Sequence, residues 1–324
     1  MATNYYAGID LGATNIRAAI ADAGGNILAV DRRETPRGPR GVDVTEAVLD
    51  AMKAACAELG IDPGEVAAAG IGSIGPLDLA AGSVVDPANL PDAIDVIPLR
   101  DPVAELLDLP DVSLHNDTTA GVIGERYYSD LNPDDMIYLT ISSGIGAGVA
   151  VDGDVLHGWD GNAGEVGHFV VDPERRRTCG CGKDGHWEAY CSGANIPEYA
   201  RDIHERENIE TDLPVDDPEF GAPDVFEATD DPLAGEVVDR IADWNAIGVA
   251  NLVHAYAPLV IAIGGAVALN NEDLVIDPIK ERVPGMIMSN VPEIRQTSLG
   301  DDVILYGAIA SALTGGGDPD AHAH

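Results

Sequence analysis

Residues 161–193 read GNAGEVGHFVVDPERRRTCGCGKDGHWEAYCSG and gather glycines, acidic side chains, histidines and cysteines into one segment. Four possible metal ligands in this segment follow the order H-x10-C-x-C-x4-H: His168, Cys179, Cys181 and His186. Thiolate and imidazole groups are the ligands that zinc prefers in a closed, four-coordinate structural site. We therefore predict a structural zinc ion in this loop, with Cys191 as the alternative to His186 for the fourth ligand.

Two glutamates flank the predicted metal site. Glu165 precedes the first of the two histidines by three residues, and Glu188 follows the second by two, so a bound metal ion would also fix both carboxylates. We expect these carboxylates to face a substrate. A disulfide is the competing interpretation, but the two cysteines of CGC are too close in sequence for an unstrained bridge. Four cysteines in 324 residues also do not suggest an oxidised scaffold.

Length and composition favour a protein of two domains without a membrane segment. The chain has 324 residues, enough for two domains of ordinary size, and its hydrophobic content of 45% excludes a wholly disordered chain. No run of about twenty uncharged apolar residues occurs. The first residues, MATNYYAGIDLG, lack a basic region before an apolar run. We therefore expect a cytoplasmic protein.

Two glycine-containing hairpins are predicted about 130 residues apart. In residues 5–21 and again in 136–151, an apolar strand leads into a turn of small and hydroxyl-bearing residues, and a second strand follows. Such turns let backbone N–H groups approach an anion closely, and Asp10 at the first turn can hold Mg²⁺. The repeat predicts two related α/β halves that face one another and hold a polyphosphate from both sides.

Helices and strands alternate through the rest of the chain. Helices are expected at 44–59, 118–128, 196–206, 235–256 and 303–313, and further strands at 66–72, 112–114 and 259–263. Residues 207–232 are expected to form an acidic loop, and residues 314–324 a disordered tail. Asp117 lies at a junction of strand and helix, where an aspartate suits catalysis in a cleft or capping of the helix. Both roles stay open.

Six motifs occur in the same order as in the ROK family of sugar kinases and regulators, which this chain resembles. They lie at residues 10–14, 70–78, 116–117, 142–148, 161–168 and 179–188, and together they extend over nearly the whole chain. The most specific is the GxxGExGH segment followed by the cysteine cluster. The resemblance implies an α/β fold with two actin-like, ribonuclease-H-like domains and a cleft between them. The implied domains are residues 1–117, joined by the C-terminal helix at 303–314, and residues 118–302, which carry the zinc loop.

The resemblance also implies roles for individual residues. Asp117 resembles the catalytic base of the family. The implied sugar contacts are Asn89, Asn116, Asp117, Glu165, His168 and Glu188, of which His168 is also a zinc ligand. The positions similar to the family's phosphate- and nucleotide-binding turns are Asp10, Gly12, Thr14, Ser142, Ser143, Gly144, Gly264 and Gly265. The implied cofactors are structural Zn²⁺ and Mg²⁺ with ATP.

The chain departs from the family pattern at two places. The family usually has a third cysteine where this chain has His186, and it often has Gly-Thr-Gly where the second hairpin reads Ser-Ser-Gly. Family members that repress transcription carry an additional N-terminal helix-turn-helix. This chain starts directly at its first strand, so we expect an enzyme rather than a repressor.

The resemblance implies an ATP-dependent hexose kinase, most simply a glucokinase, that phosphorylates the sugar 6-hydroxyl with Asp117 as general base. A fructokinase or an N-acyl amino-sugar kinase of the same family is the first alternative, because GIGSIGPLD at residues 70–78 is similar to fructokinase members. A non-catalytic sugar sensor is the second alternative, and the intact Asn116-Asp117 pair speaks against it. The expected partners are a hexose and ATP, without nucleic acid or membrane, in a homodimer or homotetramer.

The chain carries 56 acidic against 18 basic residues, a formal net charge of −38. Because nucleic acids and anionic membranes are polyanions, this charge excludes nonspecific binding to either as the main activity. The acidic residues recur throughout the sequence, and salt screens their mutual repulsion. We therefore predict a halophilic protein that is more stable to unfolding in molar salt than in dilute buffer. Greater stability in dilute buffer would contradict this prediction.

Overall fold

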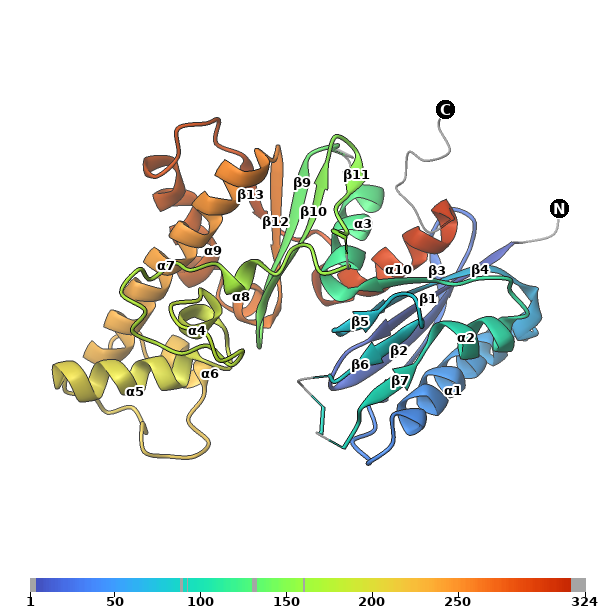
Figure 1. Ribbon diagram of the computed structural model, residues 1–324, viewed down its shortest axis with the longest axis horizontal. Coiled ribbons are helices and arrows are strands. Elements are labelled where there is room, and N and C mark those ends of the chain that lie inside the picture. The colour runs from blue at the N-terminus through green and yellow to red at the C-terminus, as the bar shows by residue number, and fades with distance from the viewer. Residues whose placement is uncertain (1–3, 88–89, 92, 130–132, 160, 316–324) are drawn as a thin grey trace. The chain divides into compact units, whose positions relative to one another are not determined.

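The computed structural model describes residues 4–87, 90–91, 93–129, 133–159 and 161–315, which form two compact α/β units (Figure 1). The first unit comprises Met1–Asp134, Gly148–Ala163 and Asp302–His324, and the second comprises Asp135–Ala147 and Gly164–Asp301. The chain therefore leaves the first unit and returns to it with its last helix. None of the helices in the described ranges is long and apolar enough to cross a membrane.

The core of the first unit is a five-stranded sheet in the order β3-β2-β1-β4-β8. Its strands are β1 (Tyr5–Leu11), β2 (Asn15–Ala21), β3 (Ile27–Glu34), β4 (Val66–Ser73) and β8 (Ser113–Asn116). Strands β1 to β3 form an antiparallel meander that begins with the predicted hairpin, and β4 and β8 continue the sheet in parallel. A smaller antiparallel sheet lies after β4 in sequence and consists of β5 (Leu77–Asp78), β6 (Ser83–Val85) and β7 (Val96–Pro98).

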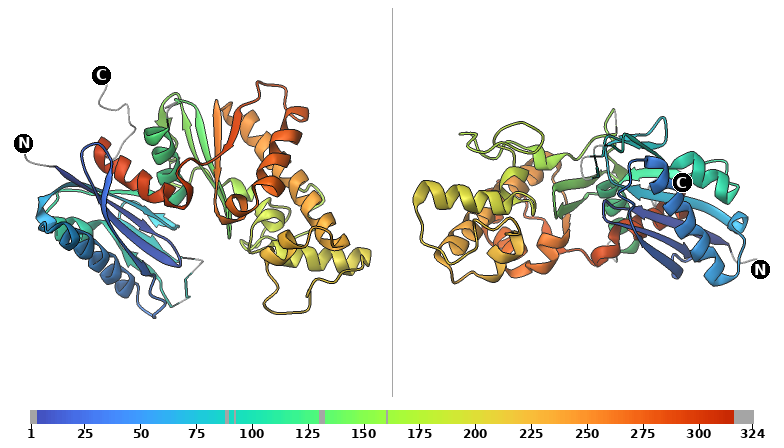
Figure 2. Two further views of the ribbon diagram at one scale, coloured as in Figure 1. Left: turned by 180° about the vertical axis from the view of Figure 1, so that it is seen from behind. Right: turned by 90° about the horizontal axis from the view of Figure 1, so that it is seen from below.

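Helices cover both faces of this sheet (Figures 1 and 2). On one face α1 (Gly41–Leu59) encloses a core that includes Ile9 and Ile16. On the other face α10 (Val303–Thr314) packs Ile309 against the small residues of β2. Because successive side chains of a strand point to opposite faces, β2 supplies side chains to both cores. The helix α2 (Arg100–Leu107) belongs to the α1 side.

Close contact between α10 and α3 (Asp117–Tyr128) depends on glycine. A Cβ atom at Gly307 would collide with the carbonyl oxygen of Ala120, and one at Gly124 would lie 2.8 Å from the backbone nitrogen of Gly307. The two backbones therefore approach more closely than any larger residue would allow. Since α3 begins with the candidate residue Asp117, this packing also helps to fix where that residue lies.

The second sheet repeats the order of the first as β11-β10-β9-β12-β13. Its strands are β9 (Met136–Ile141), β10 (Ile145–Val151), β11 (Asp154–Val155), β12 (Val260–Gly264) and β13 (Glu293–Gln296). Strand β12 is parallel to β9 and to β13. The boundary between the units falls within β10, which pairs with β11 in the first unit. The matching strand order confirms the predicted internal repeat.

The second unit carries most of the helices. They are α4 (Glu188–Cys191), α5 (Ile196–Glu207), α6 (Ala222–Glu227), α7 (Pro232–Tyr256), α8 (Ala266–Asn270) and α9 (Glu272–Arg282). Single 3₁₀ turns occur at η1 (Pro63–Glu65), η2 (Val166–His168), η3 (Val283–Gly285) and η4 (Gly300–Asp302). The expected loop at 207–232 contains α6, which starts at a proline-containing first turn. The expected disordered tail lies beyond the described residues, apart from its first two positions.

Candidate active site and metal centre

The first predicted phosphate-binding turn follows Asp10, at the end of β1. The turn is closed by hydrogen bonds: the Gly12 N–H donates to the Asn15 carbonyl at 2.9 Å, and the Thr35 N–H donates to the Thr14 carbonyl at 2.8 Å. Asp10 is only 6% exposed. The pKa of Asp10 is raised to about 7, because burial raises it more than the nearby Arg17 guanidinium lowers it, and the charge of Asp117 contributes to the rise.

Asp117 is the first residue of α3, and Asn116 is the helix N-cap. The Asn116 Oδ1 accepts hydrogen bonds from the Thr118 N–H at 3.0 Å and from the Thr118 hydroxyl at 2.8 Å. The Asp117 Oδ1 also accepts from the Thr118 N–H, at 2.7 Å. The asparagine therefore takes the capping position that the sequence left open for Asp117. A carboxylate in the first turn of a helix is also favoured by the helix dipole.

The second hairpin turn is bound to the segment that follows the metal loop. The Ser142 carbonyl accepts from the Gly193 N–H at 2.7 Å, and the Ser143 carbonyl accepts from the Ala194 N–H at 3.3 Å. Within the turn, the Ser142 N–H donates to the Gly144 carbonyl at 2.9 Å. These bonds hold the hydroxyl-bearing turn in one conformation.

Glu188 connects the metal loop with the same hairpin. Its Oε2 accepts a hydrogen bond from the Ile145 N–H at 2.9 Å, and its Oε1 lies 3.8 Å from the Cys179 Sγ. A Cβ atom at Gly144 would lie 2.9 Å from the Glu188 Oε2, so glycine makes room for this carboxylate. Glu165, in contrast, has an exposed side chain and lies 3.8 Å from the His168 Nε2.

Gly264 and Gly265 form the predicted turn after β12. Gly265 has a φ of 88°, and a Cβ atom there would lie 2.5 Å from the Ile141 carbonyl oxygen and 2.6 Å from the Thr140 Oγ1. Glycine is therefore required at Gly265 both by conformation and by space. Asn89, the remaining predicted sugar contact, lies outside the described residues.

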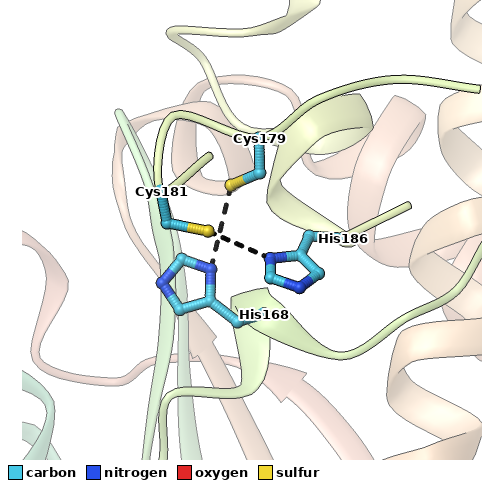
Figure 3. Close-up of side chains that lie close together, drawn as sticks. All are labelled: His168, Cys179, Cys181 and His186. Carbon is cyan, nitrogen blue, oxygen red and sulfur yellow. Dashed lines mark hydrogen bonds between the residues drawn. The ribbon is translucent and has the colours of Figure 1, made fainter. Parts of the chain in front are cut away.

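The four predicted metal ligands converge in the structure (Figure 3). One ligand atom from each of His168, Cys179, Cys181 and His186 lies within 4.8 Å of the others. The Cys179 Sγ is 3.8 Å from the His168 Nδ1, and the Cys181 Sγ is 3.3 Å from the His186 Nδ1. Ligands of a tetrahedral zinc ion are about 3.5 Å apart. The donor set therefore fits zinc in both chemistry and spacing.

Cys191 is not a member of this cluster. It is fully buried in α4, and its Sγ donates a weak hydrogen bond to the Ile241 carbonyl at 3.6 Å. Of the two candidates for the fourth position, His186 is thus the one beside the other three ligands. Backbone bonds close the loop around Cys179, whose N–H donates to the Lys183 carbonyl at 2.8 Å.

Asp172 organises the first half of the metal loop, and the sequence did not single it out. The side chain is buried and accepts hydrogen bonds from the Glu174 and Arg176 N–H groups, from the Arg176 side chain and from the Tyr190 hydroxyl. Burial alone would raise the pKa of Asp172, but these hydrogen bonds outweigh it and hold the pKa well below its usual range. The only signal in the sequence is the Asp-Pro pair, which favours a turn.

His115 also lies beside the candidate site without having been predicted. It occupies β8, just before Asn116, and is 6% exposed. Its Nε2 is 2.7 Å from the Ser311 Oγ, and its ring stacks on His157 with a centroid distance of 6.0 Å. The pKa of His115 is lowered from 6.5 to about 4, mainly by burial and in addition by the charges of His157 and Arg100.

Comparisons with known proteins agree on one family. The model of the ROK family matches residues 6–314. A glucokinase of Pyrobaculum calidifontis is 36% identical over 309 residues, which are 95% of this chain and 94% of that protein. The solved ROK hexokinase from Thermus thermophilus is similar with a TM-score of 0.77 and 32% identity, covering 95% of this chain and 97% of that one. A ROK family glucokinase from Streptomyces griseus, in complex with glucose and AMPPNP, has a TM-score of 0.72 and 30% identity, covering 96% and 99%.

We predict that His115 makes the protein sensitive to acid. Because its folded pKa lies below the unfolded value of 6.5, the unfolded chain binds a proton between pH 6.5 and about 4 that the folded chain does not. Stability is therefore lost as the pH falls through this window, at about 1.4 kcal/mol per pH unit. Urea unfolding of His115→Gln should show a shallower loss than wild type. The exposed His254→Gln serves as control, and equal slopes for His115→Gln and wild type would contradict the prediction.

Proposed function

This chain belongs to the ROK family, and we propose that it is an ATP-dependent glucokinase. The reaction would transfer the γ-phosphate of ATP to the 6-hydroxyl of glucose. The main support is the similarity over nearly the full chain to a glucokinase whose structure contains glucose and AMPPNP. The sequence similarity to the Pyrobaculum calidifontis glucokinase extends over the same range.

Asp117 is the proposed general base. A sugar hydroxyl is a poor nucleophile, and a carboxylate in hydrogen-bond reach can accept its proton as the new P–O bond forms. The position of Asp117 in the first turn of α3, beside the cap that Asn116 provides, supports this role because the carboxylate is held by a regular element. Asn116 has its Oδ1 bound to Thr118, which leaves the amide nitrogen as its donor to a sugar oxygen.

Asp10 is the proposed anchor for the Mg²⁺ that accompanies ATP. Its donor chemistry fits, because Mg²⁺ is usually held by one or two carboxylates together with phosphate oxygens. The pKa of about 7 reflects a buried carboxylate that a nearby cation would keep ionised. When bound, the ion would neutralise part of the negative charge of the phosphates. The turns proposed to contact the nucleotide contain Gly12, Thr14, Ser142, Ser143, Gly144, Gly264 and Gly265.

The remaining proposed sugar contacts come from the metal loop and its flanks. Glu165 and Glu188 would accept hydrogen bonds from sugar hydroxyls, and Asn89 would contribute its amide. His168 would donate from its Nε2–H to a sugar oxygen, because its Nδ1 faces the metal cluster. Glu188 is fixed by the Ile145 N–H, and His168 by its place in the metal cluster, so the loop can present preformed hydrogen-bonding groups. We also propose that the protein is a cytoplasmic homo-oligomer. Sedimentation analysis would determine the number of its subunits.

The function is tested by a coupled assay of ADP release over glucose, fructose, mannose and N-acyl amino sugars, at low and at molar salt. We expect the highest kcat/KM for glucose with ATP as donor. A higher value for fructose or for an N-acyl amino sugar would replace glucokinase by that activity. If the protein binds a sugar but phosphorylates none of the sugars tested, the sensor alternative would be favoured.

Replacement of Asp117 by asparagine should abolish turnover without abolishing sugar binding. The amide keeps the shape of the side chain but cannot accept a proton, so we expect kcat to fall by about 10²- to 10⁴-fold. Calorimetry should give a glucose Kd within a few-fold of wild type. Asp111→Asn, which removes a surface carboxylate of the same unit, should leave kcat unchanged. Near-normal turnover by Asp117→Asn would assign the base to another residue.

We predict one zinc ion per chain, held by the two cysteines and two histidines of the metal cluster. Elemental analysis should show that His186→Ala loses the metal, because a structural site needs all four ligands. Since the loop carries proposed sugar contacts, KM for glucose should rise in that variant. Cys191→Ala should keep the metal, and its loss there but not in His186→Ala would move the fourth ligand to Cys191.

A further inference from the structure

Four charged side chains form a row across the first three strands of the first unit. The strand register places Asp10 of β1 opposite Arg17 of β2, and Arg17 opposite Arg32 of β3. Directly opposed residues of neighbouring strands lie on the same face of a sheet, so these side chains are neighbours. Asp302, the N-cap residue of α10, contacts both arginines. Along these contacts the charges therefore alternate, from Asp10 through Arg17 and Asp302 to Arg32.

The contacts within this row are short. The Arg17 Nη1 lies 3.5 Å from the Asp10 Oδ2 and donates a hydrogen bond to the Asp302 Oδ1 at 3.0 Å. The Arg32 Nη2 donates to both oxygens of Asp302, each at 3.0 Å. The guanidinium of Arg17 is thus shared between two carboxylates. It makes its hydrogen bond to Asp302 and only a looser ion pair with Asp10.

Asp302 is not used as a helix cap, although it occupies the N-cap position of α10. Aspartate in this position normally accepts a hydrogen bond from a backbone N–H of the first turn. The side chain of Asp302 makes no such bond. Its carboxylate is directed to the two arginines instead, so capping does not account for the carboxylate at this position.

We propose that Asp302, fixed by Arg32, is a positioning residue that holds Arg17 back from Asp10 and so keeps the Asp10 carboxylate available for the Mg²⁺ of the nucleotide. This role rests on the proposed kinase function. Without Asp302, Arg17 still has the Asp10 carboxylate within ion-pair distance, at 3.5 Å. An arginine that paired fully with Asp10 would compete with the metal ion for the same oxygens, since both need the ionised carboxylate.

The start of α10 is a suitable place for such a group. The helix packs directly on β1, β4 and α3, and the contacts at Gly8, Gly70 and Gly307 are so close that a larger residue would not fit there without a shift. Asp302 is therefore attached to a rigid element, whereas Arg17 has a long side chain with many rotamers. A short carboxylate on a fixed helix can select one of those rotamers.

The test is the affinity for Mn²⁺ in the presence of AMPPNP, followed by electron paramagnetic resonance, which needs no turnover. Replacement of a group that orients a metal ligand typically weakens metal affinity by about 10- to 100-fold. For Asp302→Asn we therefore expect a Kd for Mn²⁺ about tenfold higher than wild type. The Mg²⁺ concentration that gives half-maximal kcat should rise by a similar factor, while KM for glucose stays unchanged.

The double variant Asp302→Asn with Arg17→Gln separates positioning from a general loss of structure. Removal of the competing guanidinium should recover most of the Mn²⁺ affinity, whereas a structural defect would be made worse. Asp302→Glu, which keeps the charge, should stay close to wild type. Arg32→Gln should weaken Mn²⁺ binding by about threefold, less than the roughly 10- to 100-fold effect of losing an orienting group, because Asp302 and its bond to Arg17 remain. This variant takes the place of Asp302→Asn if that one does not fold. Arg33→Gln is its matched control, because Arg33 pairs with Asp31 on the same strand and outside the row.

The outcomes distinguish this inference from the function on which it rests. Unchanged Mn²⁺ affinity in Asp302→Asn, or no recovery in the double variant, would overturn the role of Asp302. If wild type binds Mn²⁺ and AMPPNP but phosphorylates no sugar, the glucokinase function fails while the role of Asp302 is still measured. If wild type binds no Mn²⁺ with AMPPNP, both are wrong.

Discussion

The first unit is built around a carboxylate that is costly to bury. Asp10 is 6% exposed at the end of a central strand, and a buried charge without compensation is strongly unfavourable. The antiparallel meander solves this by register, since it brings Arg17 opposite Asp10 with no more than a hairpin turn between them. A shift of one residue in this pairing would move the guanidinium to the opposite face of the sheet, among the apolar side chains under α1. The strand register therefore determines which charges lie beside Asp10.

Helix packing transmits that constraint to the rest of the unit. Asp117 is the first residue of α3 and Asp302 is the N-cap of α10, and the two helices touch through Gly124 and Gly307. Because the backbones approach so closely there, a larger side chain at either glycine would force the helices apart. The distance between the two helix starts follows from a contact near the middle of each helix. Small residues in the helices thus determine where the acidic groups at the helix ends lie.

The sequence predicts what is local or repeated, and it misses pairs that the fold brings together. The end of α1 is marked by Gly60, which has the left-handed conformation that glycine favours, and the metal ligands all lie within nineteen positions. Both were predicted. Arg17 and Asp302 are 285 residues apart, so neither residue indicates its partner before α10 is placed against the sheet. Helix α6 was missed because six residues are too few to show a helical period.

The two sheets share a strand order but stabilise their hairpin turns by different means. In the first hairpin the turn is held by its own backbone and by Thr35, which follows β3 directly. In the second, the corresponding turn is held by Glu188 and by Gly193, both of which come from beyond the metal loop. From an internal repeat one would expect both turns to be held in the same way. The repeat cannot predict the bonds to the second turn, since the metal loop has no counterpart in the first half. The segment that follows the metal loop therefore does in the second unit what the residue after β3 does in the first: it fixes the turn on which the proposed phosphate contacts lie.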